Sequence, residues 1–143
     1  MTIHQLSIFI ENRSGTLIKV LDQLKEANIQ IIASTIADTA EYGIYRLICS
    51  EPLRAYDCLK KAGVAVALSD VFALELDNQP GRAADAIKAF SKAGISIAYM
   101  FSFLLKGKGI LVFRTDNAEL ARQTILENNL HYVPENELTE WAE

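Results

Sequence analysis

Two short segments share a pattern of residues that could bind a small anion. They are residues 12–15, Asn-Arg-Ser-Gly, and residues 78–81, Asn-Gln-Pro-Gly. Each precedes a pattern typical of a helix, and a glycine turn at a helix start presents backbone N–H groups without intrahelical acceptors. The helix dipole and the missing glycine Cβ favour a carboxylate there. The asparagine carboxamides could accept a hydrogen bond from an ammonium group of the same ligand.

Residues suited to catalysis or metal binding are scattered rather than grouped. Cys49 and Cys58 form no CxxC pair, so we interpret them as reduced, partly buried thiols. His4 and His131 have no partner at metal-ligand spacing, and we expect neither a metal nor a cofactor. An enzyme would need a nucleophile with a base, or two converging carboxylates, and Ser14 has no assigned base. The sequence therefore predicts a protein without catalytic residues.

The composition is that of a globular protein. The 143 residues are 50% hydrophobic and 22% charged, which provides enough apolar material for a packed core. The formal net charge of −4 disfavours nucleic acid as a partner. The apolar runs are far shorter than the ~20 residues of a membrane helix, and the N-terminus has no cationic leader. We therefore expect a cytoplasmic protein with no nucleic-acid partner and no membrane partner.

The chain repeats itself with a shift of 66 residues. Gly15 aligns with Gly81, and Gly43 aligns with Gly109. Further identical pairs are Ala27 and Ala93, Ile29 and Ile95, and Ile31 and Ile97. Such self-similarity indicates two copies of one structural unit. We expect a first unit at 1–68, a second unit at 69–134 and a C-terminal tail at 135–143.

Four strands are predicted in each unit. Apolar and polar residues alternate at 4–10 and at 70–76, which predicts the first strand of each unit. Runs rich in β-branched and aromatic residues predict the others. These strands lie at 29–35, 42–50 and 64–68 in the first unit, and at 95–103, 107–115 and 130–133 in the second.

Two helices are predicted in each unit. The second helices begin at Ser50-Glu51-Pro52, where Pro is permitted in the first turn, and at Asp116, where Glu119 completes a capping-box pattern. The residues that close the four helices are of the types best able to adopt the left-handed conformation. They are Asn28, Gly63, Gly94 and Asn129.

The order of elements in each unit is β-α-β-β-α-β, which is the ferredoxin-like arrangement of the α+β class. Both helices of such a unit lie on one face of its antiparallel sheet. The other face is also apolar, because Leu111, Val112 and Phe113 occupy consecutive positions of one strand. An apolar second face predicts burial against another sheet or subunit.

The stretches 9–31 and 73–97 resemble the ACT domain, a small regulatory module that binds ligands. Its first turn usually reads Asp-x-Pro-Gly-x-Leu, and its second strand opens with Gly-Ile-Asn-Ile. The resemblance covers both units, so the whole chain is similar to a tandem ACT protein. Asn12 and Asn78 stand where the family has Asp, and Ser14 replaces the Pro. Ala83 replaces the Leu, while Gln30 and Ser96 replace the second-strand Asn.

The resemblance implies two units with their sheets side by side and a free amino acid bound at the junction between them. The duplicated turn, the missing catalytic constellation and the surplus apolar sheet face favour a non-enzymatic regulatory protein that forms a homodimer or larger homo-oligomer. The candidate ligand-binding residues come from both turns and from the second strand of each unit. They are Asn12, Arg13, Ser14, Gly15, Thr16, Leu17, Asn78, Gln79, Pro80, Gly81 and Arg82, with Ser34, Thr35, Tyr99, Met100 and Phe101 on the strands.

Three other functions are compatible with a ferredoxin-like frame. A protein-interaction module would have the same fold without a small ligand. A small-molecule enzyme could use the same frame, but it would need a nucleophile with a base or two converging carboxylates. An RNA-binding sheet shares this topology, yet basic and aromatic motifs of the RNP type are absent from the first and third strands.

Overall fold

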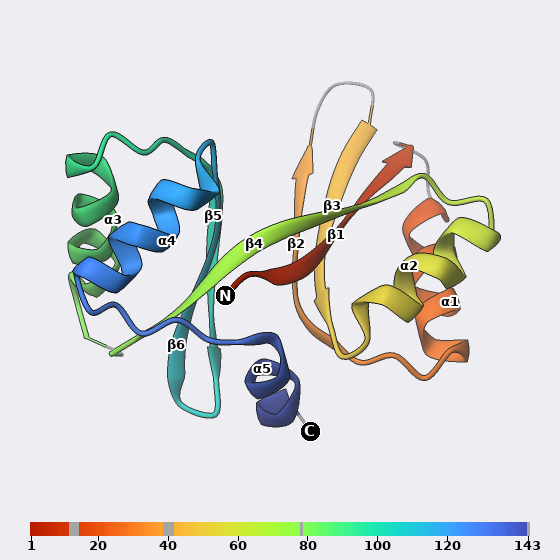
Figure 1. Cartoon of the computed structure of the whole chain (residues 1–143). Helices are drawn as coiled ribbons and strands as arrows, with labels where there is room; N and C mark the ends of the chain where they lie inside the picture. Colours follow the sequence, from red (N-terminus) through yellow and green to blue (C-terminus); the bar gives the residue numbers. More distant parts are fainter. Residues whose placement is uncertain (12–14, 39–41, 78, 143) are drawn as a thin grey trace. The chain divides into compact units, whose positions relative to one another are not determined.

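The computed structural model describes residues 1–11, 15–38, 42–77 and 79–142 (Figure 1). The chain divides into two compact units. The N-terminal unit comprises His4–Ser69, and the C-terminal unit comprises Asp70–Glu143 together with Met1–Ile3. Each combines antiparallel strands with helices, and the predicted ferredoxin-like α+β class is confirmed.

The N-terminal unit is a sheet with the strand order β2-β3-β1-β4. In its antiparallel register Leu6 lies opposite Leu47, and Ile8 lies opposite Tyr45. The Phe9 N–H donates to the carbonyl oxygen just before β4, that of Ala65, at 2.9 Å. The elements are β1 (Ile3–Glu11), α1 (Thr16–Glu26), β2 (Ile31–Asp38), β3 (Tyr42–Cys49), α2 (Pro52–Lys61) and the beginning of β4 (Val66–Leu76).

The core of the N-terminal unit lies between this sheet and its two helices. Alternation along β1 turns Leu6 and Ile8 to one face, where they are fully buried. Helical spacing places Val20 and Leu24 of α1 on the side that meets this face. Leu59 of α2 belongs to the same cluster. Both helices therefore bury one apolar stripe each against the same side of the sheet.

The C-terminal unit repeats this plan with the strand order β4-β6-β5. Phe72 lies opposite Phe113 in the antiparallel register, and their ring centres are 5.6 Å apart. Phe90 of α3 packs on Phe113 with ring centres 4.9 Å apart, which joins helix and sheet in one core. The remaining elements are α3 (Arg82–Lys92), β5 (Ile97–Leu105), β6 (Lys108–Thr115), α4 (Ala118–Glu127) and α5 (Glu135–Ala142).

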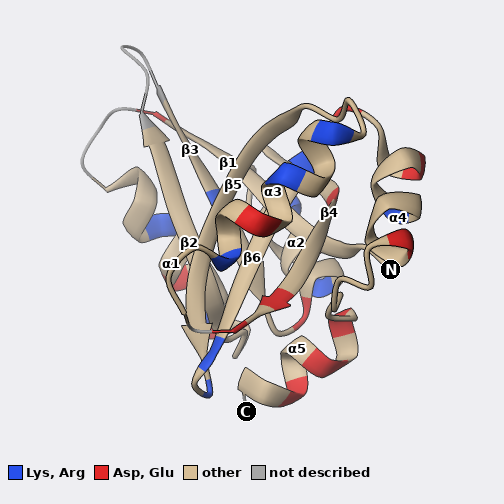
Figure 2. Cartoon of the chain, turned by 90° about the vertical axis from the view of Figure 1, so that its left-hand side faces the viewer, with Lys and Arg blue, Asp and Glu red and all other residues tan. Residues whose placement is uncertain are grey.

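Helix α5 occupies the region expected as a C-terminal tail and packs on the C-terminal unit. Its Leu138 is buried, and the Lys108 Nζ lies 3.8 Å from the centre of the Trp141 ring. Lys108 is an odd number of positions away from the core residues Leu111 and Phe113 on the same strand. Its side chain therefore faces the other side of the sheet. Part of the second face is thus covered by the chain's own helix, whose charged residues are all acidic in Figure 2.

The four predicted helix-closing residues are confirmed. Asn28 has a φ of 57° and Asn129 a φ of 52°, while Gly63 and Gly94 have φ values of 83° and 78°. The two asparagines end α1 and α4, and the two glycines end α2 and α3. The predicted start of α2 at Ser50-Glu51-Pro52 is also confirmed, with Glu51 as the cap and Pro52 as the first helical residue.

The predicted capping box at the start of α4 is wrong by one residue. The cap is Asn117, whose side chain accepts a hydrogen bond from the Leu120 N–H at 3.1 Å. The Asp116 carboxylate instead accepts from the Ser96 N–H at 3.1 Å. Asp116 therefore links the start of β5 to the end of β6 and is not available to cap the helix.

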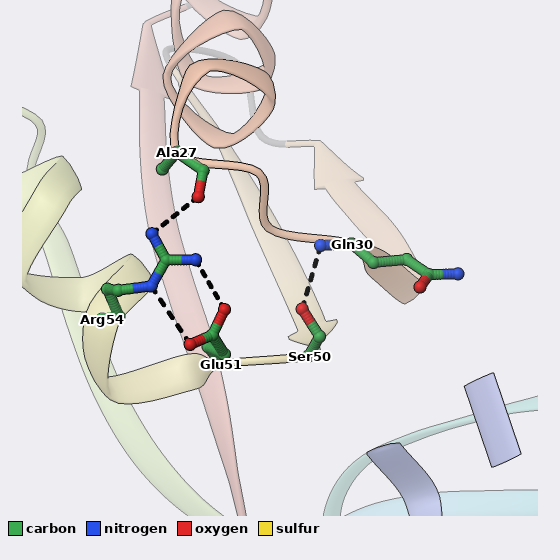
Figure 3. Close-up of polar contacts among 5 residues, drawn as sticks. All are labelled: Ala27, Gln30, Ser50, Glu51 and Arg54. Atoms are coloured by element: carbon green, nitrogen blue, oxygen red, sulfur yellow. Dashed lines mark hydrogen bonds and ion pairs between the residues drawn. The ribbon is translucent and has the colours of Figure 1, made fainter. Parts of the chain in front are cut away.

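The N-terminal unit has the equivalent link one repeat earlier (Figure 3). The Gln30 N–H donates to the Ser50 hydroxyl at 3.0 Å, and the Ser50 N–H donates to the Gln30 carbonyl at 2.9 Å. Beside it the Arg54 guanidinium pairs with Glu51 and donates to the Ala27 carbonyl. These contacts hold the end of α1 against the start of α2.

The predicted fourth strands differ from the observed ones. The first of them joins the following strand, so that β4 runs continuously over Val66–Leu76. The second, at 130–133, forms only an isolated bridge between Leu74 and Tyr132. Backbone hydrogen bonds flank this bridge, from the Glu75 N–H to the His131 carbonyl and from the Val133 N–H to the Ala73 carbonyl, both at 2.8 Å.

Candidate functional site

The two predicted turns place a glycine at the start of the first helix of each unit. Gly15 caps α1 with a φ of 99°, and Gly81 caps α3 with a φ of 87°. A glycine has no side chain that could cap either helix. At α3 the Arg82 N–H donates to the Gln79 carbonyl at 3.4 Å, and the next N–H groups of the first turn have no intrahelical acceptor. Among the described residues, no atom lies within 4 Å of a Cβ placed on either glycine. The left-handed φ, not crowding, therefore accounts for the glycine.

Four predicted residues, Asn12, Arg13, Ser14 and Asn78, lie outside the described residues. Of the others in the first turn, Thr16 and Leu17 are half-buried at the start of α1. Thr16 lines a cavity of the N-terminal unit. In the second turn Gln79 and Pro80 are exposed immediately before Gly81.

A cavity of about 350 Å³ in the C-terminal unit begins beside the Gly81 turn. The lining combines the predicted residues Gln79 and Arg82 with Asp77. The opposite wall comes from β5 and β6, and it comprises Ser102, Phe103, Leu104, Gly109 and Ile110. The uncapped start of α3 and a mixed polar and apolar cavity are thus adjacent in one unit.

Arg82 is the cation of this cavity. Its Nη2 donates to the Gln79 Oε1 at 3.3 Å, and its Nε lies 3.4 Å from Asp77 Oδ2. Its Nη1 lies 3.5 Å from Asp85 Oδ2. The side chain remains 44% exposed, so the guanidinium is positioned by three partners and still reaches solvent. A cation between two carboxylates is suited to a zwitterion, which brings one charge of each sign.

The predicted strand residues of the C-terminal unit precede the cavity. Tyr99, Met100 and Phe101 lie on β5, opposite Arg114, Phe113 and Val112 of β6. The described lining contains instead the next three residues of β5, Ser102–Leu104. The turn at Lys106-Gly107, where both φ values are positive, sets this register. This two-residue turn is the sequence feature from which the position of residues 102–104 could have been predicted.

The predicted strand residues of the N-terminal unit, Ser34 and Thr35, lie on β2. Ser34 is exposed opposite Leu47, and Thr35 is half-buried opposite Arg46. They belong to the edge strand of this unit in the order β2-β3-β1-β4. Their part in a ligand site stays a prediction.

The cysteines and His131, which are the sequence's candidates for catalysis or metal binding, are not among the described residues that line the Arg82 cavity. Cys49 is buried and Cys58 is half-buried, as expected for structural thiols. His131 Nε2 lies 3.2 Å from Glu75 Oε2, which pairs that imidazole with a carboxylate. Among the described residues no three His, Cys, Asp or Glu side chains are grouped as a metal site. No helix in the described part of the chain has the length and apolar character needed to span a membrane.

The chain belongs to the ACT domain pair family, whose model matches residues 1–142. The resemblance seen in the two turns is therefore confirmed, and it extends over both units. The family model describes a pair of ACT domains, which resemble regulatory domains. A comparison with curated proteins finds no match.

Several solved structures have a similar fold. Protein BT0572 from Bacteroides thetaiotaomicron is 35% identical with a TM-score of 0.92, over 98% of this chain and 97% of that one. The ligand-free regulatory subunit of aspartate kinase from Thermus thermophilus is 15% identical with a TM-score of 0.61, over 87% and 91%. Aspartate kinase from Synechocystis is 16% identical with a TM-score of 0.57, over 92% of this chain and 26% of that one.

Proposed function

We propose that this chain is a non-enzymatic regulatory protein that binds a free amino acid at the turn before α3. The observation that carries the proposal is the uncapped helix start at Gly81 next to a cavity of about 350 Å³. Cavities of this size accept small molecules. Family membership supports the regulatory part, because the ACT domain pair is a regulatory module.

The charges around the cavity match those of an amino acid. The α-carboxylate accepts hydrogen bonds from the N–H groups that follow Arg82 in the first turn of α3 and from the Arg82 guanidinium, where the helix dipole adds a partial positive charge. The ammonium group pairs with Asp77, which lines the same cavity. The ligand side chain then lies along Ser102 and Leu104 of β5.

The expected affinity is modest. Two or three charge-assisted hydrogen bonds contribute about 1.5–3 kcal/mol each, and association costs several kcal/mol in lost freedom. The balance corresponds to a dissociation constant in the micromolar to millimolar range. A site of this strength responds to changes in the concentration of a free metabolite and does not hold it permanently.

We further propose that the chain forms a homodimer or a larger assembly through strand edges. In the C-terminal unit β5 is the edge strand, and its Met100 and Leu104 are 51% and 63% exposed. A long, uncharged edge strand with exposed apolar side chains favours pairing with another strand. The same observation supports the second candidate function, a protein-interaction module without a small ligand.

The proposal is tested by thermal unfolding of the full chain with each common amino acid. A ligand present at about 100 times its dissociation constant adds about 2.7 kcal/mol to the free energy of unfolding, so the correct amino acid raises Tm by several degrees. Arg82→Gln should weaken its binding about tenfold, because one charge-assisted bond is lost. Lys92→Gln, at the other end of α3, is the matched control and should bind normally.

The outcome separates the two candidate functions. If no amino acid raises Tm, or if Arg82→Gln binds as tightly as the natural chain, amino-acid binding at this turn is rejected. Light scattering then tests the interaction module. A monomer at all concentrations would also reject assembly through β5.

A further inference from the structure

The last helix, α5, depends on its contacts with the C-terminal unit, because a helix of eight residues is not stable alone. The segment before it is joined to β4 by two backbone hydrogen bonds. They run from the Val133 N–H to the Ala73 carbonyl and from the Glu75 N–H to the His131 carbonyl, both at 2.8 Å. Within the helix, Leu138 is buried.

A series of charged contacts connects this segment to the last turn of α5. The Glu75 carboxylate contacts two basic groups, because its Oε2 lies 3.2 Å from His131 Nε2 and its Oε1 lies 3.5 Å from Lys108 Nζ. The Lys108 Nζ in turn lies 3.8 Å from the centre of the Trp141 ring on α5. The contacts therefore run from the imidazole through two strands of the sheet to the helix.

The N-terminal unit makes the same backbone hydrogen bond without this ion pair. Its counterpart is the bond from the Phe9 N–H to the Ala65 carbonyl at 2.9 Å, 66 residues earlier in the repeat. Phe9 stands where the second repeat has Glu75, and Ala65 stands where it has His131. The fold of a unit therefore needs neither the imidazole nor the carboxylate. The pair occurs in the unit that carries α5.

A positive charge on His131 attracts the sheet and the helix together. The imidazole is 65% exposed, and it lines a cavity of about 310 Å³ with Glu137 of α5. The charged and titratable groups around it are Glu75 from β4, Lys108 from β6 through its contact with Glu75, Glu137 from α5 and the adjacent Tyr132 phenol. Carboxylates stay ionised at mildly acidic pH, whereas imidazoles gain a proton between about pH 8 and pH 5.

We propose that α5 is a pH-sensitive strap, which docks on β4 and β6 more tightly when His131 carries a proton. The charged imidazole attracts Glu75 on the sheet and Glu137 on the helix. Loss of the proton removes both attractions, so α5 undocks more often as the pH rises. An ion pair exposed to solvent changes such an equilibrium by about two- to fivefold.

The strap lies behind one wall of the cavity at Arg82. Leu76 and Gly109 are opposite each other in the antiparallel register, and both line that cavity. Glu75 and Lys108 are their neighbours along the two strands, so their side chains point to the other face of the sheet. Docking of α5 therefore restrains the strands that carry this wall. The strap goes beyond the proposed function because it needs no ligand.

The test measures amide hydrogen exchange in α5 of the full chain without ligand, at about pH 5.5 and about pH 7.5. After correction for the intrinsic pH dependence of exchange, the protection of the α5 amides reports the ratio of docked to undocked helix. We expect about two- to fivefold higher protection at the lower pH. Equal protection at the two pH values would overturn the proposal.

Two variants and a control assign the effect to one imidazole. His131→Gln removes the charge and should give the lower protection at both pH values. His131→Lys keeps a cation at both pH values and should give the higher protection throughout. His4→Gln changes the other histidine of the chain and should keep the natural pH dependence. A dependence that persists in His131→Gln, or that disappears in His4→Gln, would overturn the proposal.

Glu75→Gln provides an independent check should a variant of His131 fail to fold. It removes the carboxylate that His131 and Lys108 share. Protection of α5 at the lower pH should therefore fall towards the value that the natural chain has at the higher pH. Unchanged protection at the lower pH would also overturn the proposal.

The strap and the proposed function can fail separately. Exchange in α5 is measured without ligand, so it decides the strap even if no amino acid binds to the chain. If an amino acid binds through Arg82 while protection of α5 is independent of His131, the proposed function stands and the strap is rejected. If protection depends on His131 while no amino acid binds, the strap stands and the proposed function fails.

Discussion

The guanidinium of Arg54 donates a hydrogen bond to the carbonyl oxygen of Ala27 at 2.6 Å, so the first turn of α2 holds the end of α1 (Figure 3). Carbonyl groups at a helix C-terminus have no intrahelical donor, and here a side chain supplies one. Arg54→Met should therefore lower Tm in thermal unfolding. Arg122→Met, at an exposed position of α4, is the control and should leave Tm unchanged. Equal Tm values for the two variants would show that the bond to Ala27 does not stabilise the fold.

The contact between Arg54 and Glu51 makes stability depend on pH. The hydrogen bond from Arg54 lowers the pKa of Glu51 below its ordinary value of 4.5. The unfolded chain therefore binds this proton more readily than the folded chain does. The contribution is present above pH 4.5 and is lost as the pH falls through the lowered pKa.

Urea unfolding across an acidic pH series measures this effect. Glu51→Gln should lower the free energy of unfolding at about pH 7 and match the natural chain at about pH 3. In the Arg54→Met background the same substitution should have little effect at either pH, because the partner is absent. A pH-independent difference between Glu51→Gln and the natural chain would contradict the assignment.

Gly81→Ala should reduce stability and ligand binding together. The φ of 87° is unfavourable for alanine by about 1–2 kcal/mol, which denaturant unfolding will show. The altered turn also moves the N–H groups that we assign to the carboxylate, so amino-acid affinity should fall. Gly94→Ala, with a φ of 78° at the other end of α3, should lose similar stability and keep its affinity. If both variants bind equally well, the Gly81 turn is not the carboxylate site.

Gly109 and Gly43 are equivalent in the repeat but differ in what a Cβ would meet. At Gly109 the Cβ would lie 3.1 Å from the Leu76 carbonyl oxygen, whereas at Gly43 it would lie 3.3 Å from a side-chain carbon of Ile10. A side chain can move aside, but a paired backbone cannot. Gly109→Ala should therefore cost about 1–3 kcal/mol, and Gly43→Ala should cost less. Calorimetric unfolding of the two variants measures the order, and the reverse order would contradict this explanation.

Much of each unit could be predicted from local patterns. The alternation at 70–76 correctly placed Phe72 and Leu74 in the core, because period two turns alternate residues to one face. It did not show that β4 continues from Val66 through Ser69 and Asp70. Strand continuity depends on backbone hydrogen bonds to partners far away in the sequence. The placement of a ligand at the junction of the two units stays a prediction.

By itself the sequence determined the repeat, the family and the residues at which the first four helices end. Asn28, Gly63, Gly94 and Asn129 could be identified because a left-handed φ is a preference of single residues. Only the tertiary structure decided which side chains meet around each cavity. Ser102–Leu104 lie beside Arg82, and Ala65 stands where the other repeat has His131, because strand register and side-chain volume act between residues that are distant along the chain.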